Sequence, residues 1–166
     1  MSGRSRTMTA TSGLAALLLL LAASMAFGAG LEEERQAYKA KVEPICKQNR
    51  QANERVLKGV KSNIKSGKLS LAGTQFAKAA VALKKARTQL LAVPQPSADS
   101  ARLTKWLGLV KTELELFERV SKKLKAGDAH SAQRMALLLT STVNRANNTV
   151  LPYEFNYCRV QTSQFL

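Results

Sequence analysis

Hydrophobic positions recur through most of the chain with the spacing of a helix and not with the alternation of a strand. Apolar or small side chains repeat at steps of three, four and seven residues, which places them on one helical face. The pattern predicts four helices, at residues 31–66, 70–93, 98–125 and 129–151. β-Branched residues are few and no alternating run persists, so we expect no strand.

The third predicted helix has the strongest pattern. Trp106 lies beside Leu103 and Val110, so the large indole belongs to the same region of the helix surface. The apolar stripe itself comprises Leu103, Leu107, Val110, Leu114, Phe117 and Leu124.

Turn residues separate the predicted helices. Pro44 interrupts the first one and should kink it or begin a new helix, because proline removes a donor and clashes with the carbonyl four residues back. Ser70 and Asp128 are the expected caps of the second and fourth helices. The stop signals are Gly67, Pro94–Ser97, Gly127 and Pro152. Since the connections are short, we expect an all-α, antiparallel up-down-up-down four-helix bundle.

The first thirty residues differ from the rest. Arg4 and Arg6 precede an uncharged apolar run at residues 14–27, and small residues at 28–30 precede the charged LEEER. This layout is typical of a signal peptide with cleavage between residues 26 and 30, which leaves residues 31–166 as a single helical domain. The alternative is an uncleaved segment that tethers the protein to a membrane, although the run is short for a span of ~20 residues.

Export determines how the two cysteines are interpreted. Cys46 and Cys158 are 112 positions apart, and two cysteines in an exported chain predict one structural disulfide. The alternative, a redox pair, usually requires close spacing such as Cys-x-x-Cys. In a straight antiparallel pair Cys158 would lie about 10 Å beyond Cys46, too far for a disulfide. We therefore expect residues 152–158 to turn at Pro152 across the end of the bundle, where three aromatic side chains would close it: Tyr153, Phe155 and Tyr157.

One stretch carries a resemblance. Tyr38 is followed by Val42–Lys47 (VEPICK), and Cys158 lies near the C-terminus. In these features the chain resembles uncharacterised secreted helical proteins of actinomycete-type bacteria, which pair an N-terminal with a C-terminal cysteine. The resemblance implies export and a helical fold, and it brings no activity and no binding residues with it.

Catalytic and metal chemistry find little support. His130 is the sole histidine, and we expect it to be exposed in the last helix and not to be a metal ligand. No Gly-x-Ser-x-Gly motif, haem attachment motif or phosphate-binding glycine loop is present. Glu113, Glu115 and Glu118 on the third helix fit solvated ion pairs, Glu115 with Arg119 and Glu118 with Lys122, better than acid–base work. We therefore predict neither an enzyme nor a cofactor.

Asparagines gather near the end that the cysteines tie together. Asn49 and Asn53 lie one turn apart on the first helix, and the others come from the end of the fourth helix and beyond it: Asn144, Asn147, Asn148 and Asn156. We favour a hydrogen-bonded network that fixes the helix register. The alternative is that these side chains line a small pocket under the aromatic residues.

Charge supplies the best functional clue. The chain has a formal charge of +15, and loss of residues 1–30 would remove only Arg4 and Arg6, which leaves +13. Seven lysines, called the basic pole below, end the first and third helices, which share one end of the expected bundle: Lys58, Lys61, Lys65, Lys68, Lys122, Lys123 and Lys125. Such a cluster attracts polyanions. The lysines also have an explanation without a partner: cations near a helix C-terminus interact favourably with the helix dipole, and net charge aids solubility.

The basic pole contains no aromatic residues, which argues against sequence-specific binding of nucleic acid. Our leading hypothesis is therefore a non-enzymatic exported module that binds an anionic cell-envelope component, either a polymer or lipid head groups, through the basic pole. The alternative is a carrier that holds a small ligand between helices near Trp106, Tyr153 and Phe155. The oligomeric state does not follow from the sequence.

Overall fold

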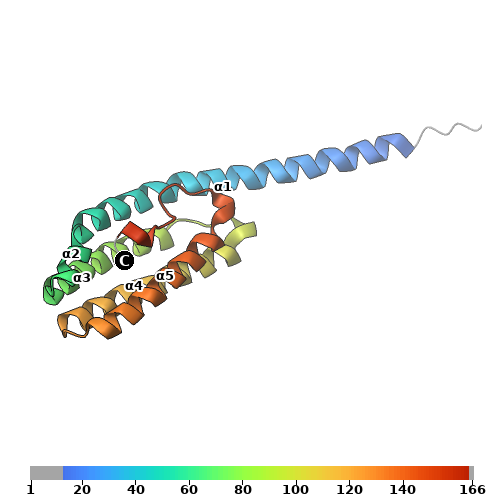
Figure 1. Cartoon of the computed structure of the whole chain (residues 1–166). Helices are drawn as coiled ribbons and strands as arrows, with labels where there is room; N and C mark the ends of the chain where they lie inside the picture. The colour runs from blue at the N-terminus through green and yellow to red at the C-terminus, as the bar shows by residue number, and fades with distance from the viewer. Residues whose placement is uncertain (1–12, 165–166) are drawn as a thin grey trace, which may run out of the picture.

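The computed structural model describes the backbone of residues 13–164 and the side chains of residues 30–163, and the first twelve residues of the predicted signal peptide lie outside it. All its elements are helical, as the sequence predicts (Figure 1). The α-helices are α1 (Gly13–Leu57), α2 (Val60–Lys65), α3 (Leu69–Leu91), α4 (Ser100–Lys125) and α5 (Ala129–Thr149). Three short 3₁₀ helices are η1 (Ser97–Asp99), η2 (Leu151–Tyr153) and η3 (Thr162–Gln164).

The first predicted helix is divided at a different residue from the one expected. Pro44 does not begin a new helix, because α1 continues through it. Pro44 and Ala40 are both exposed, so water can reach the carbonyl that Pro44 leaves without a donor. The break comes instead at Gly59, whose φ of 77° is readily adopted by glycine, and α2 then resumes the helix.

The other helix ends agree with their signals except for one cap. Lys68, and not Ser70, precedes the first residue of α3. Asp128 caps α5 as predicted, since its carboxylate accepts a hydrogen bond from the Ser131 N–H at 2.9 Å. The last helix ends at Thr149, before Pro152.

The core lies where α4 packs between α3 and α5, with α1 packed against α3. Trp106, Phe76 and Leu139 are among its largest fully buried side chains. At one place α3 and α4 approach very closely: a Cβ on Gly73 would lie 2.8 Å from the Ser121 carbonyl oxygen. The Ser121 hydroxyl also donates to the Gly73 carbonyl at 2.7 Å. A larger residue than glycine would therefore push the two helices apart.

Residues 152–163, called the C-terminal segment below, lie between α1 and α5 (Figure 1). Cys158 forms a disulfide with Cys46 of α1, with the Cα atoms 4.9 Å apart. The predicted pairing and the predicted turn after the last helix are both confirmed. A structural disulfide is typical of an oxidising, extracytoplasmic environment. Within the described ranges, no helix offers a stretch both long and apolar enough for a membrane span.

Candidate functional site

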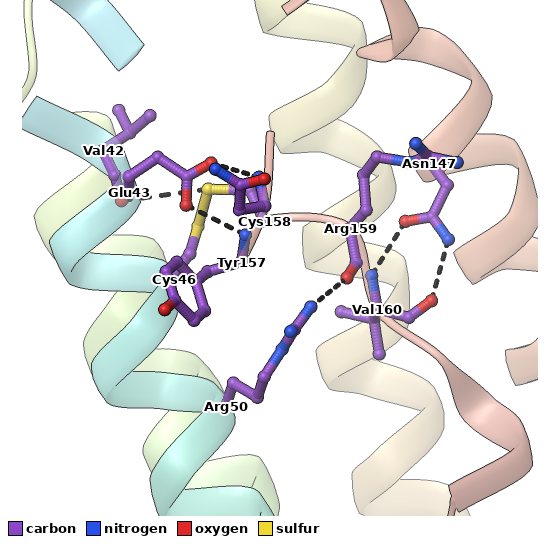
Figure 2. The surroundings of a disulfide bond; sticks show 10 residues. Val42, Glu43, Cys46, Arg50, Asn147, Tyr157, Cys158, Arg159 and Val160 are labelled. Atoms are coloured by element: carbon purple, nitrogen blue, oxygen red, sulfur yellow. Dashed lines mark hydrogen bonds between the residues drawn. A yellow bond between two sulfur atoms is a disulfide. The ribbon is translucent and has the colours of Figure 1, made fainter. Parts of the chain in front are cut away.

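The C-terminal segment is attached to α1 at consecutive turns (Figure 2). The Glu43 carboxylate accepts hydrogen bonds from the backbone N–H groups of Asn156 and Tyr157, the latter at 2.9 Å. The disulfide follows one turn along α1. One turn further, Arg50 Nη2 donates to the Arg159 carbonyl at 2.7 Å, and its guanidinium lies 5.3 Å from the Tyr157 ring centroid. These contacts hold the segment against one side of the helix.

The same segment is attached to α5 on its other side. Asn147 Nδ2 donates to the Val160 carbonyl at 2.8 Å, and the Val160 N–H donates to Asn147 Oδ1 at 3.0 Å. Figure 2 shows the segment between the two helices with these anchors on either side. It therefore links α1 to α5.

Aromatic rings close the end of the bundle beyond the disulfide. Tyr153 stacks on Phe155 with centroids 5.1 Å apart, and Phe155 lies 5.7 Å from Trp106. Tyr38 contacts Tyr153 edge-on at 5.7 Å. Burial raises the pKa of Tyr38 to about 12. Tyr153 and Phe155 are buried and Tyr157 is half-buried, so these rings pack at this end of the bundle.

Asp99 fixes the aromatic cluster to α1 and α4. Arg35 donates to its carboxylate through Nε at 2.6 Å and Nη2 at 3.1 Å. The Tyr153 hydroxyl donates at 3.0 Å. The hydrogen bonds from Arg35 lower the pKa of Asp99, and burial together with the neighbouring carboxylate raises the pKa of Tyr153. Because every group in this set has a partner, we assign it a structural role.

A cavity of about 350 Å³ lies between the helices and the C-terminal segment, and exposed lining residues such as Glu54 and Lys58 bring it to the surface. This volume is at the lower end of the range of small-molecule sites, roughly 300–1,000 Å³. α1, α3, α4, α5 and the C-terminal segment all contribute to its wall. The apolar and aromatic part of the lining includes Leu57, Leu83, Leu90, Trp106, Val110 and Tyr157.

One acidic side chain from α4 faces this cavity. Glu113 is 4% exposed, and no hydrogen bond or ion pair links it to any other residue in the described part of the chain. Burial raises the pKa of its carboxyl from 4.5 to about 8. The expectation that Glu113 would be a solvated ion-pairing residue is therefore wrong. Its sequence signal was its position, three residues after Val110 and four before Phe117, on the inward stripe.

The asparagines divide between the two roles considered for them. Asn49, Asn53 and Asn147 line the cavity, as the pocket hypothesis requires, whereas the others are exposed: Asn144, Asn148 and Asn156. Asn53 Nδ2 donates to Asn49 Oδ1 over a long 3.4 Å, and Asn53 Oδ1 is buried without a partner. Asn147, by contrast, is used in attaching the C-terminal segment.

The remaining predicted residues lie on the surface. Glu115 pairs with Lys111 at 3.7 Å and not with Arg119, and no ion pair joins Glu118 to Lys122 among the described side chains. His130 is exposed, as expected. Over residues 30–163, no group of three or more histidine, cysteine or acidic side chains is placed to hold a metal ion.

The seven lysines of the basic pole are all exposed. They surround the α2–α3 and α4–α5 turns, which lie at the same end of the molecule in Figure 1. Lys123 forms a 3.4 Å ion pair with Asp128, and Lys61 Nζ donates to the Ser163 carbonyl at 2.9 Å. Hydrogen bonds from Ser131 lower the pKa of Asp128 to about 2. Lys58 also lies at the wall of the cavity.

Comparisons of the chain with protein-family models, with curated proteins and with solved structures yield no match. The functional argument therefore depends on the chain's own residues.

Proposed function

We propose that this protein is a non-enzymatic, exported four-helix module of up-down-up-down topology that carries a small ligand in the cavity beneath the C-terminal segment. The signal peptide expected at residues 1–30 supports secretion into the extracytoplasmic space, where the Cys46–Cys158 disulfide is stable.

The observation that carries the proposal is the presence of Glu113 on the cavity wall. Burial of a carboxyl group without a partner lowers stability, because the group loses its hydration and gains no compensating hydrogen bond. An apolar residue at this position of α4 would complete the stripe. A cavity with an apolar lining and a few convergent polar groups is the usual form of a small-molecule site. A bound ligand would supply the missing partner.

Trp106 allows a direct test, because it is the single tryptophan of the chain and lines the cavity. The disulfide-bonded protein would be titrated with compact organic amines, alcohols and acids while Trp106 fluorescence and the melting temperature are recorded. We expect saturable binding by at least one class. Ala146→Leu, which fills the cavity from α5, should weaken that binding at least tenfold, whereas Ala101→Leu on the exposed surface of α4 should not.

Absence of binding by all three classes would contradict the carrier proposal. Equal binding by the wild type and Ala146→Leu would also contradict it, because the probe would then occupy another place.

A second candidate function is favoured by the basic pole. Seven exposed lysines at one end of a chain with charge +15 would attract an anionic cell-envelope component, a wall polymer or lipid head groups. In this proposal the pole contacts the envelope.

The test of the second candidate uses lysines for which the structure gives no side-chain hydrogen bond or ion pair. Lys65, Lys68 and Lys122 would be changed to Glu together, and the matched control changes Lys41, Lys84 and Lys105, which are also exposed. Binding to anionic vesicles, to a polyphosphate polymer and to DNA is measured across a salt series. Steeply salt-dependent binding that the first variant loses and the control retains supports the pole. Equal loss in both variants would show that only net charge matters.

A further inference from the structure

The Glu113 carboxyl is a polar group of the cavity wall without a partner among the described residues, and Asn53 Oδ1 also lacks a partner but is itself fully buried. Asn49 Oδ1 receives only the long bond from Asn53. In its ionised form the Glu113 carboxylate offers acceptors only, so a ligand that binds that form must bring donors.

Two of the protein's donors on the cavity wall are already engaged elsewhere. Arg50 is directed to the Arg159 carbonyl and the Tyr157 ring, and the Asn147 amide is bonded to Val160 through both its ends. The other charged side chains along the wall, Glu54 and Lys58, are exposed. Among the described side chains, no ion pair joins Glu113 to Arg50 or Lys58.

The apolar part of the cavity wall indicates the chemistry of the rest of the ligand. Leu83 and Leu90 from α3 and Val110 and Trp106 from α4 give the cavity an apolar side. Such a surface favours a hydrocarbon or aromatic body. The volume of about 350 Å³ limits that body to a small molecule.

We propose that the cavity binds a compact primary amine with an apolar body, whose ammonium group pairs with the Glu113 carboxylate. The inference rests on the carrier function proposed above and specifies its ligand class. An ammonium group supplies three N–H donors, and its attraction to the carboxylate offsets part of the cost of burying that charge.

The ionisation of Glu113 gives this binding a proton signature. Below a pKa of about 8 the free protein holds Glu113 protonated, so an arriving ammonium ion displaces that proton to solvent. The other titratable or charged groups that line the cavity are Arg50 and Glu54 from α1, Lys58 after it and Tyr157 from the C-terminal segment; the lining from α3 and α5 has none. Near pH 6.5 the release should thus come from Glu113, and binding should strengthen as the pH rises toward 8.

The experiment compares 2-phenylethylamine with its neutral analogue 2-phenylethanol on the full disulfide-bonded protein. Affinity is measured by Trp106 fluorescence and by calorimetry at pH 6.5 in two buffers of different ionisation enthalpy. We expect the amine to bind at least tenfold tighter than the alcohol and to release close to one proton. Glu113→Gln should remove the preference and retain binding of the alcohol. The matched control Glu115→Gln alters an acid on the same helix outside the cavity and should change neither.

The outcomes separate the two proposals. Equal affinities of the amine and the alcohol for the wild type, or amine binding without proton release, overturn the amine inference and leave the carrier function in place. If neither probe binds and the broader panel also fails, both are overturned. The proton count comes from the wild type, so the test does not depend on the folding of any variant.

Discussion

Asn147 on α5 and Val160 in the C-terminal segment exchange two hydrogen bonds, at 2.8 and 3.0 Å, in the way that two paired strand residues do. A side-chain amide thus stands in for a backbone on one edge of the segment. The opposite edge is held on α1 by Glu43 and the disulfide. The segment is consequently a wall of the cavity as well as a chain terminus.

Asn147→Ala removes both bonds and leaves the polar backbone of Val160 without partners. We expect a loss of about 1–3 kcal/mol in the free energy of unfolding, at about 0.5–1.5 kcal/mol for each of the two part-buried bonds. Hydrogen exchange at the Val160 amide should accelerate more than exchange in α3. Asn144→Ala, one turn earlier on α5 and exposed, is the control and should change neither quantity. If the Val160 amide remains protected in Asn147→Ala, the exchange of bonds does not hold the segment.

The double substitution Cys46→Ser and Cys158→Ser opens a loop of 112 residues. Loop-closure entropy sets a ceiling of about 4–5 kcal/mol for such a link, and typical disulfides contribute about 2–4 kcal/mol. Urea unfolding should shift by an amount in this range, and reduction of the wild type with dithiothreitol should reproduce the shift. Proteolysis after the same treatment should cut first within residues 152–163. A variant as stable as the oxidised wild type would contradict the predicted role of the bond.

Gly73→Ala introduces a methyl group 2.8 Å from the Ser121 carbonyl oxygen, where backbone has to move. Overpacking of this kind costs about 1–3 kcal/mol. Thermal or urea unfolding would measure the loss. Gly108→Ala is the matched control, because Gly108 is exposed in α4 and an added Cβ meets nothing within 4 Å. There the better helix propensity of alanine should raise stability by about 0.5–1 kcal/mol, so the two substitutions should have opposite signs.

Several elements could be predicted because the sequence signals them by position alone. Stripe spacing gave the helices from residue 69 to residue 149 within a few residues, and counting residues along antiparallel helices required the turn that brings Cys158 to Cys46. The break at Gly59 does not follow from the sequence, because an isolated glycine is tolerated inside a helix at a cost of about 1 kcal/mol relative to alanine. Of the two effects expected of Pro44, a new helix does not begin there, because α1 continues through this exposed position.

The cavity was harder to predict than the fold. Periodicity places Glu113 on the inward face, but the prior that glutamates on a helix pair with nearby lysines outweighed that position. The neighbouring Glu115 does follow that prior. Asn49, Asn53 and Asn147 were correctly placed together, since the antiparallel register brings their positions to one level. The cavity itself depends on whether the side chains of facing helices fill the space between them, and the spacing of residues along the sequence does not give that packing.

Glu113 should make stability depend on pH in the direction opposite to most carboxylates. Its carboxyl has a pKa of about 8 in the folded protein and an ordinary value of 4.5, so between these limits the unfolded chain has released a proton that the folded chain retains. Stability therefore falls as the pH rises from about 4.5 to 8, by at most about 1.4 kcal/mol per pH unit for this one group. The contribution of Asp99 to stability depends on pH in the reverse direction. Its pKa is lowered in the folded protein, so this contribution is lost as the pH falls below about 3.8.

Glu113→Gln removes this titration and keeps the shape of the side chain. We expect the variant to match the wild type near pH 4.5 and to exceed it in unfolding free energy at pH 8. Urea unfolding at half-unit intervals of pH measures both curves, and Glu115→Gln, on the exposed side of α4, should follow the wild type throughout. Parallel curves for the wild type and Glu113→Gln would mean that the carboxyl ionises normally in the folded state, and hence that water or a solute already satisfies it.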